Sequence, residues 1–336
     1  MSSQITRLIP VAVVVVVLAL LLYEVLWAPN NFDGDRVVAV SKGMSFARVA
    51  DSLAAAGVIR NRKLFETAGE LLGMTRQMHI GKYSFHSGVS NKEILDDLGT
   101  GKSAIIIPVL IREGLRARAQ ARIYGRELGI DSARFVQLVS EPEFVRSSGI
   151  EGISLEGYLL PETYLFYWQT DEEQIIRRMV EGFQSFYVDS LQRRAGELGM
   201  TTDKVLTFAS IVEGEAILDD ERSIIAGVYY NRLKKHMRLE ADPTIQYIID
   251  DGPRRLFHND LWVQSPYNTY RNYGLPPGPI NNPGRASILA TLYPASHKYL
   301  YFVANGQGGH TFSRTFAEHK KATYRYRRIR AQLGSP

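Results

Sequence analysis

A run of apolar residues that follows Thr201 ends in a glutamate, Glu213. Apolar residues recur there at helical spacing, after threonines and an aspartate that are typical of a helix start. A carboxyl group packed against apolar side chains keeps its proton to a higher pH than one in water, so it can serve as a general acid. The opposing interpretation is a solvated glutamate or one half of an ion pair. The spacing alone leaves both open.

A second carboxyl follows two residues later, at Glu215. Two helical steps rotate a side chain by about 200°, so the two glutamates face different sides unless Gly214 ends the helix. We therefore expect one acid at the site rather than a pair. The acidic residues at 219–221 suit the positive end of a second helix, which should run to about Lys235.

The composition narrows the class of protein. With 336 residues, 45% of them hydrophobic, the chain can form two or more folded units with sizeable cores, and we expect an α+β fold. The net charge is +5, but basic residues are spread among 35 acidic ones, so no nucleic-acid partner is expected. The chain has no cysteine, no glycine-rich phosphate loop, no HExxH helix and no GxSxG turn. We expect neither a cofactor nor a metal.

Residues 8–27 form an apolar segment about as long as a membrane helix requires. A cleaved signal peptide is the alternative, but residues 23–31, YEVLWAPNN, which follow the apolar run 8–22, show no small-x-small cleavage pattern. Arg7 precedes the segment and Glu24 lies near its far end, which favours a cytoplasmic amino terminus at residues 1–7. We predict a single-pass anchor in the plasma (inner) membrane, with the bulk of the chain periplasmic or otherwise extracytoplasmic.

Residues 37–103 are predicted to form a small α/β module of a binding kind, with a strand, two helices, a second strand and a final short helix. A weaker copy occupies 104–150, where VLIREG aligns with VAVSKG, and it leads into the remaining region. The copy carries a run of arginines that predicts a solvated face rather than a ligand site: Arg112, Arg116, Arg118, Arg122 and Arg126.

Residues 151–336 are predicted to form a mixed α+β domain. The segment LEGYLLPETYLF is interpreted as a packed turn, and Asp171 to Leu198 as one helix beneath the site. The proline- and glycine-rich stretch 265–284 cannot be regular helix or strand. It is either a rigid wrap over the core or a binding loop, whose aromatic rings and amides could hold sugars. The candidates are Tyr267, Asn268 and Tyr270.

Several of these segments together resemble the endolytic murein transglycosylase (YceG-like) family, and the resemblance covers nearly all of the chain after the apolar segment. The motifs are ASIVEGE, VYYNRL, MRLEADPTIQY, YNTY with GLPPGPINNPG, and YFVANGQGGHTFS. The chain departs from the family pattern at Gly214, where a lysine is common, and at VLIREG, where a TIPEG-like strand is common.

The resemblance implies a membrane-anchored lyase with a LysM-like module at 37–103 and a catalytic domain at 151–336. Such an enzyme cleaves the MurNAc-β-1,4-GlcNAc bond within nascent peptidoglycan and leaves 1,6-anhydroMurNAc ends, with penicillin-binding synthases as further partners. The family's catalytic glutamate corresponds to Glu213, which would act first as acid and then as base. We expect further polar support for the substrate from Glu215, Asn231, Asp242 and Gln246.

Two other functions fit the same segments. One is a non-catalytic scaffold that grips peptidoglycan and docks onto wall synthases. The other is a hydrolytic glycosidase that uses Glu213 together with a second acid, such as Glu215 or Glu162. The product ends separate these readings, because a lytic transglycosylase leaves anhydro ends and a hydrolase leaves reducing ends.

Overall fold

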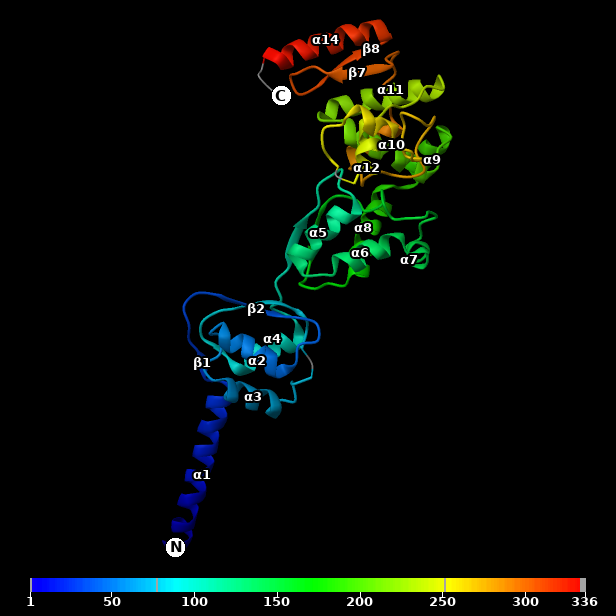
Figure 1. The fold of residues 1–336 in the computed structure, drawn as a ribbon. Helices are drawn as coiled ribbons and strands as arrows, with labels where there is room; N and C mark the ends of the chain where they lie inside the picture. The colour runs from blue at the N-terminus through cyan, green and yellow to red at the C-terminus, as the bar shows by residue number, and fades with distance from the viewer. Residues whose placement is uncertain (1, 77, 251, 333–336) are drawn as a thin grey trace. The chain divides into compact units, whose positions relative to one another are not determined.

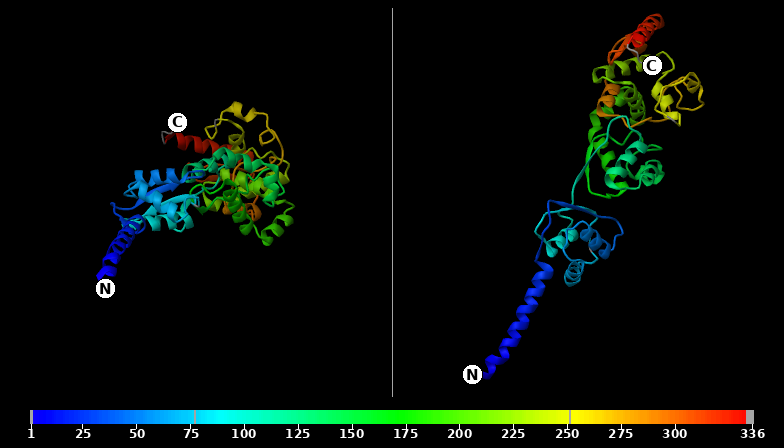
Figure 2. Two further views of the ribbon diagram at one scale, coloured as in Figure 1. Left: turned by 90° about the horizontal axis from the view of Figure 1, so that it is seen from below. Right: turned by 60° about the vertical axis from the view of Figure 1, so that its left-hand side comes forward.

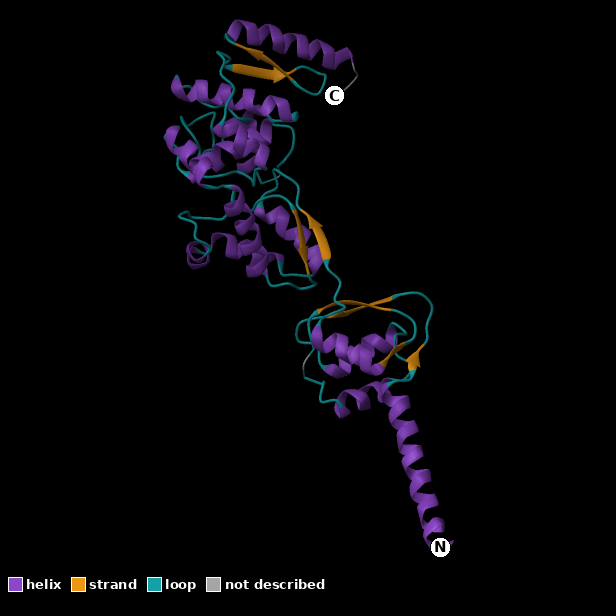
Figure 3. Cartoon of the chain, turned by 180° about the vertical axis from the view of Figure 1, so that it is seen from behind, coloured by secondary structure: helices purple, strands orange, loops and turns teal. Residues whose placement is uncertain are grey.

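The computed structural model describes residues 2–76, 78–250 and 252–332, and side chains from residue 10 onward. By its contacts the chain divides into two compact units. Unit 1 comprises residues 1–109, 126–130 and 165–171, and unit 2 comprises 110–125, 131–164 and 172–336. Of the predicted segment 104–150, residues 110–125 and 131–150 therefore fall in unit 2. Helices dominate both units, and the strands form short two-stranded ladders (Figure 3).

Unit 1 has a small α/β core of the kind that the sequence predicts. Strand β2 pairs antiparallel with β3, from Arg36 opposite Phe85 to Val40 opposite Gly81. Apolar residues of these strands and of three helices form one cluster, in which Val49, Leu53 and Phe65 are fully buried. The elements are α1 (Ser2–Leu26), β1 (Pro29–Asn30), β2 (Arg36–Val40), α2 (Phe46–Ala55), α3 (Arg62–Leu71), β3 (Gly81–Phe85), β4 (Val89–Ser90), α4 (Asn91–Thr100) and β5 (Ile107–Leu110).

Helix α1 contains most of the predicted membrane anchor. Its carboxyl-terminal end joins the core of unit 1 through Leu26, and the helix extends away from that core (Figures 1 and 2). The large apolar side chains between Val11 and Leu22 are exposed. None of the helices that the described residues form has both the length and the apolar character needed to cross a membrane.

Unit 2 is built around α10, which packs against α11, α12 and α13. Every residue of α10 from Val205 to Val212 is buried, and Thr201 caps its start by accepting a hydrogen bond from the Lys204 amide. Its elements include α5 (Ala117–Leu128), α6 (Ser132–Ser140), α7 (Pro142–Ser147), β6 (Thr163–Phe166), α8 (Glu172–Phe186), α9 (Asp189–Glu197), α10 (Thr202–Glu215), α11 (Arg222–Lys234), α12 (Asp242–Ile248) and α13 (Arg285–Leu292). A hairpin of β7 (Tyr301–Ala304) and β8 (His310–Ser313) is covered by α14 (Phe316–Gln332) (Figure 1).

The prediction of one helix from Asp171 to Leu198 is wrong. The chain forms α8 and α9 instead, because Val188 adopts an extended conformation with ψ near 170° and begins the second helix as its cap. Tyr187, just before the break, is buried and its ring stacks on Phe183 at 5.2 Å. The predicted apolar face persists in α8, where Ile175, Met179 and Phe183 are buried.

Candidate active site at the end of α10

The two glutamates at the end of α10 face different surroundings. The helix continues through Gly214 to Glu215, so the two side chains leave it on different sides, as the helical geometry predicts. Glu213 contacts α11 and the segment before α13, whereas Glu215 contacts Tyr229. The carboxyl end of α10 therefore brings one acid to each of two neighbouring groups of polar residues.

The carboxylate of Glu213 is buried in an ion pair. Its side chain is 6% exposed, and Oε1 accepts a hydrogen bond from Arg222 Nη1 at 3.0 Å. Oε2 accepts from the amide of Gly284 at 2.9 Å. The apolar surroundings expected for this carboxyl are thus replaced by charged and polar ones, as the ion-pair interpretation held.

Arg222 is shared among three carboxylates. Besides Glu213, it donates from Nε to Asp219 at 2.9 Å, and Nη2 lies 3.7 Å from Glu113 Oε2. Its Nη1 also donates to the hydroxyl of Ser287 at 2.6 Å. We call these five residues the Arg222 cluster. Three carboxyl groups therefore face one guanidinium in this cluster.

Glu113 is a member of this cluster that the sequence did not single out. Burial, followed by the charge of Glu213, raises the pKa of its carboxyl. The carboxyl lies directly against Gly284, where an added Cβ would be 1.8 Å from Glu113 Oε1. A side chain at Gly284 would therefore overlap the Glu113 carboxyl unless that side chain moved away. The only signal in the sequence was the position of Glu113 after a predicted strand, in the segment VLIREG, where the chain departs from the family pattern.

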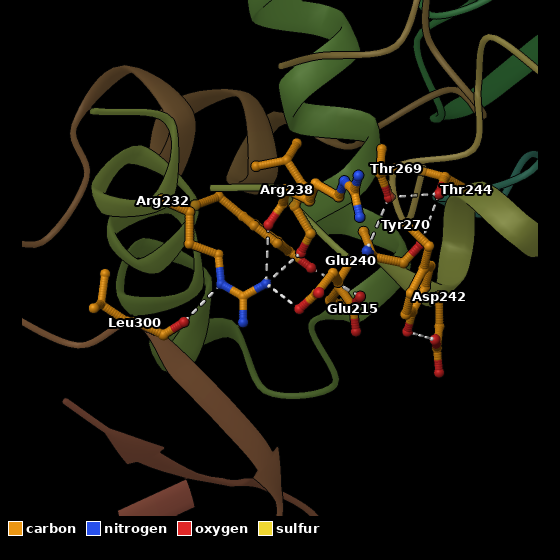
Figure 4. A network of polar contacts seen from close by, with 12 residues as sticks. Glu215, Arg232, Arg238, Glu240, Asp242, Thr244, Thr269, Tyr270 and Leu300 are labelled. Carbon is orange, nitrogen blue, oxygen red and sulfur yellow. Dashed lines mark hydrogen bonds and ion pairs between the residues drawn. The ribbon is translucent and has the colours of Figure 1, made fainter. Parts of the chain in front are cut away.

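On the other side of α10, Glu215 accepts a hydrogen bond from the hydroxyl of Tyr229 at 2.9 Å. Burial, followed by the charge of Asp242, raises the pKa of Glu215 to about 7. Asp242 in turn accepts a hydrogen bond from the hydroxyl of Tyr270 at 2.5 Å (Figure 4). The structure thus brings together three residues that the sequence placed in the site: Glu215, Asp242 and Tyr270.

Arg232 of α11 holds the chain that leads into α12 (Figure 4). It donates to the carbonyl oxygens of Leu239 at 2.9 Å and Leu300 at 2.7 Å, and it pairs with Glu240 at 3.0 Å. These bonds position the segment that places Asp242 opposite Glu215. A second tie joins α12 to the proline-rich loop, through the buried hydroxyls of Thr244 and Thr269 at 2.8 Å (Figure 4).

Glu215 and Asp242 line two cavities. The larger, of about 440 Å³, lies between α5, the end of α10 and α12. The smaller, of about 230 Å³, is also lined by Tyr229, Arg232 and Tyr270. Glu213 lines neither of these two cavities. It lies just behind the larger one, because a Cβ added to Gly114 in the cavity wall would be 3.5 Å from Glu213 Cγ.

The other predicted site residues are used by the fold. Asn268 is fully buried, and its amide donates to the carbonyl oxygens of Leu261 and Val263. The side-chain amide of Asn231 donates hydrogen bonds to the carbonyl oxygens of His297 and Tyr299. Asn231 lines neither of the two cavities. Gln246 lines the larger cavity, but its amide binds the backbone of Arg254.

Tyr267 and the LEGYLLPETYLF turn also have structural contacts. The ring of Tyr267 packs on that of Tyr247 at 4.8 Å, and burial raises its pKa to about 12. Glu156 accepts from the amide of Ala117, the first residue of α5, at 2.9 Å. Burial raises the pKa of Glu156 to about 7. Glu162 pairs with Arg285. The first half of this segment is the packed turn that the sequence predicts, with Leu155 and Leu159 buried, and the second half forms strand β6.

Comparison with known proteins identifies the family. The model of the YceG-like family matches residues 38–325. An endolytic murein transglycosylase of Bacillus subtilis is 32% identical over 302 residues, covering 85% of this chain and 83% of the relative. One from Streptococcus pneumoniae is 26% identical, and the chain spans about half its length, 55%. The crystal structure of a YceG-like protein from Listeria monocytogenes matches with a TM-score of 0.61 and 33% identity, covering 85% of this chain and 98% of that one. The chain belongs to the YceG-like family.

Proposed function

We propose that this chain is an endolytic murein transglycosylase that cuts within nascent peptidoglycan strands. It cleaves the β-1,4 bond between MurNAc and GlcNAc and leaves 1,6-anhydroMurNAc ends. The family and the names of the relatives support the activity. The observation that carries the chemistry is Glu213, a carboxyl buried at the end of a rigid helix beside two further acids.

The proposed reaction needs one protein carboxyl because the substrate supplies the nucleophile. Glu213 donates a proton to the leaving glycosidic oxygen as the bond from the anomeric carbon to that oxygen breaks. The 6-hydroxyl of the same MurNAc residue attacks the anomeric carbon and gives its proton to the Glu213 carboxylate. Intramolecular attack in good alignment lowers the barrier by several kcal/mol, on the order of 7 or more.

The Arg222 cluster holds the carboxyl of Glu213 in place during this cycle. Arg222 Nη1 donates to one carboxyl oxygen and the Gly284 amide donates to the other. Charge-assisted hydrogen bonds of this kind fix the direction of a carboxylate. The carboxyl is therefore held in one orientation.

Replacing Glu213 by glutamine tests this proposal. We expect Glu213→Gln to fold as the parent does but to release anhydro ends from uncross-linked glycan strands roughly a hundredfold to ten-thousandfold more slowly. Product ends are identified by mass spectrometry, and thermal unfolding reports the fold. Glu143→Gln, on the exposed face of α7, is the matched control and should keep full activity. A parent that releases no product, with equal wall phenotype and peptidoglycan binding from Glu213→Gln and the parent, would instead favour a non-catalytic wall-binding scaffold.

A hydrolytic glycosidase is the second candidate, and one observation favours it. Glu215 and Asp242 lie on the wall of the same cavity, and a hydrolase uses two carboxyls. Burial also raises the pKa of Glu215 to about 7, as suits a general acid at neutral pH. Open reducing ends in the products, and their loss in Glu215→Gln but not in Glu213→Gln, would select this reaction.

The proposed enzyme is anchored in a membrane and acts outside the cytoplasm. Residues 8–27 anchor the chain in the plasma (inner) membrane, with residues 1–7 cytoplasmic and the remainder extracytoplasmic. The apolar sequence of this segment and the exposure of its side chains from Val11 to Leu22 support the anchor. Residues 37–103 act as a LysM-like module, supported by the compact α/β core of unit 1. Peptidoglycan is the main partner, and penicillin-binding synthases are further ones.

A further inference from the structure

The cavity of about 440 Å³ beside Glu213 has an unequal distribution of charge. Three arginines of the segment leading into and through α5 lie on one wall: Arg116, Arg118 and Arg122. The carboxyls of Glu215 and Asp242 lie among the residues contributed by α10 and α12. Its volume is within the range of small-ligand sites.

Two of these arginines are free to bind a ligand. Arg118 and Arg122 are four positions apart on α5, so they share one face of the helix, and both are exposed. Neither forms a hydrogen bond or an ion pair with any residue in the described ranges 2–76, 78–250 and 252–332. The sequence predicted a solvated face here, but the structure places these two side chains at a cavity.

Arg116 differs from its two neighbours because the fold already uses it. It donates from Nη2 to the carbonyl oxygen of Gln246 at 2.5 Å, and its guanidinium lies 4.5 Å from the centre of the Tyr247 ring. Arg116 therefore shapes the wall of the cavity. Arg118 and Arg122 are the groups available to a carboxylate.

The two carboxyls that line the cavity suit an ammonium group. Asp242 is bonded to Tyr270, and Glu215 to Tyr229, so both carboxyls are held in place by phenol hydroxyls. Each still has oxygen atoms that can accept a further hydrogen bond. A ligand that carries both a carboxylate and an ammonium would match the arginines and the carboxyls of this cavity.

We propose that this cavity binds the peptide stem of the murein strand, with a stem carboxylate on Arg118 and Arg122 and the side-chain amine of the diamino acid toward Glu215 and Asp242. This inference rests on the proposed function. Murein stems are attached to the MurNAc residue whose glycosidic bond is cut, and in nascent strands they carry free carboxylates and a free amine. Gly114 in the cavity wall lies against the side chain of Glu213, so a stem bound in the cavity would hold its sugar near the acid.

The binding of a free stem peptide tests the site apart from catalysis. The probe is an uncross-linked tetrapeptide with a free diamino-acid amine, titrated calorimetrically into the full-length chain. We expect Arg118→Gln and Arg122→Gln each to weaken binding by about tenfold, because each removes charge-assisted hydrogen bonds to a carboxylate. Acetylation of the diamino-acid amine should weaken the parent's binding by a similar factor.

Arg193→Gln is the matched control, because it removes an exposed arginine of α9 that does not line the cavity. It should bind the tetrapeptide as the parent does. Absence of peptide binding by the parent, or equal binding by Arg118→Gln, Arg122→Gln and the control, would overturn the inference.

The two proposals fail separately. If the parent cuts glycan to anhydro ends but peptide binding does not depend on Arg118 and Arg122, the stem site is wrong and the proposed function stands. If binding depends on the arginines but no anhydro ends form, the site stands and the proposed reaction is wrong. In an active parent the arginine variants should also raise KM for stem-bearing strands more than for strands stripped of their stems.

Discussion

Glu213 and Glu215 are separated by one residue, yet their surroundings differ in chemistry. Glu213 is hydrogen-bonded to a guanidinium and to a backbone amide. Glu215 is enclosed beside another acid, and its pKa rises to about 7 from an ordinary value of 4.5. The difference arises because a two-residue step along a helix reverses the direction of the side chain.

The raised pKa of Glu215 predicts a dependence of stability on pH. Between about pH 4.5 and 7 the folded chain keeps a proton on Glu215 that the unfolded chain has lost. The stabilisation from this group is therefore fully present below about pH 4.5 and is lost as the pH rises through about 7. Glutamine keeps a neutral acceptor for Tyr229 at every pH.

We accordingly expect Glu215→Gln to gain stability relative to the parent as the pH rises from about 5 to 8, by up to roughly 3 kcal/mol. Urea unfolding of both proteins across this range measures the difference. The other titrating groups, including Glu156, are common to both proteins and cancel in the comparison. A difference that does not vary with pH would show that Glu215 is not enclosed as the structure has it.

At the scale of elements, the site depends on how closely α10 approaches α12. Gly214 lies at the contact, where a Cβ would be 2.6 Å from Cβ and 2.7 Å from Cγ of Pro243. Pro243 is in the first turn of α12, next to Asp242, and its ring cannot rotate away as a flexible side chain could. The glycine thus allows α10 to continue as a helix while the start of α12 lies against it.

Gly214→Ala is expected to destabilise the fold by about 1–3 kcal/mol, because the added methyl group overlaps the proline ring. Gly196→Ala is the matched control, since Gly196 is also inside a helix but has no atom within 4 Å of its added Cβ. There alanine should stabilise by about 0.5–1 kcal/mol through its higher helix propensity. Chemical denaturation gives both values, and equal effects at the two positions would argue against the close contact.

At the scale of the whole molecule, the cores of the two units are built from different elements. The core of unit 1 is a small α/β cluster to which the end of α1 contributes Leu26. That of unit 2 surrounds α10, so the residues that bury this helix also orient its terminal acids. The amide of Asn91 donates to the carbonyl oxygen of Val25, which ties the end of α1 to unit 1.

These contacts specify how the proposed anchor should be removed. Deleting residues 1–22 keeps Val25 and Leu26 in the core of unit 1, so we expect unit 1 to remain folded. The parent should sediment with membranes and resist a carbonate wash, because about 20 apolar residues suffice for a membrane helix. The truncated chain should remain in the supernatant. Release of the parent by the wash would contradict the anchor.

Features that depend on neighbours in the chain were determined by the sequence alone. Apolar residues at helical spacing predicted α10, with its Thr201 cap, and α2, and the strand patterns at 37–43 and 81–90 predicted β2 and β3. Such features depend on hydrogen bonds and side-chain periods within a few residues, so they can be recognised without knowing the fold.

Features that depend on distant residues were decided only by the tertiary structure. Glu213 is hydrogen-bonded to Arg222 and to the amide of Gly284, which lie 9 and 71 residues away along the chain. Whether its carboxyl would lie among apolar or charged groups was therefore not determined locally. For the same reason Arg118 and Arg122 could be recognised as a charged helical face but not as the wall of a cavity. Burial and charge pairing arise from which surfaces pack together, and that depends on the whole folded chain.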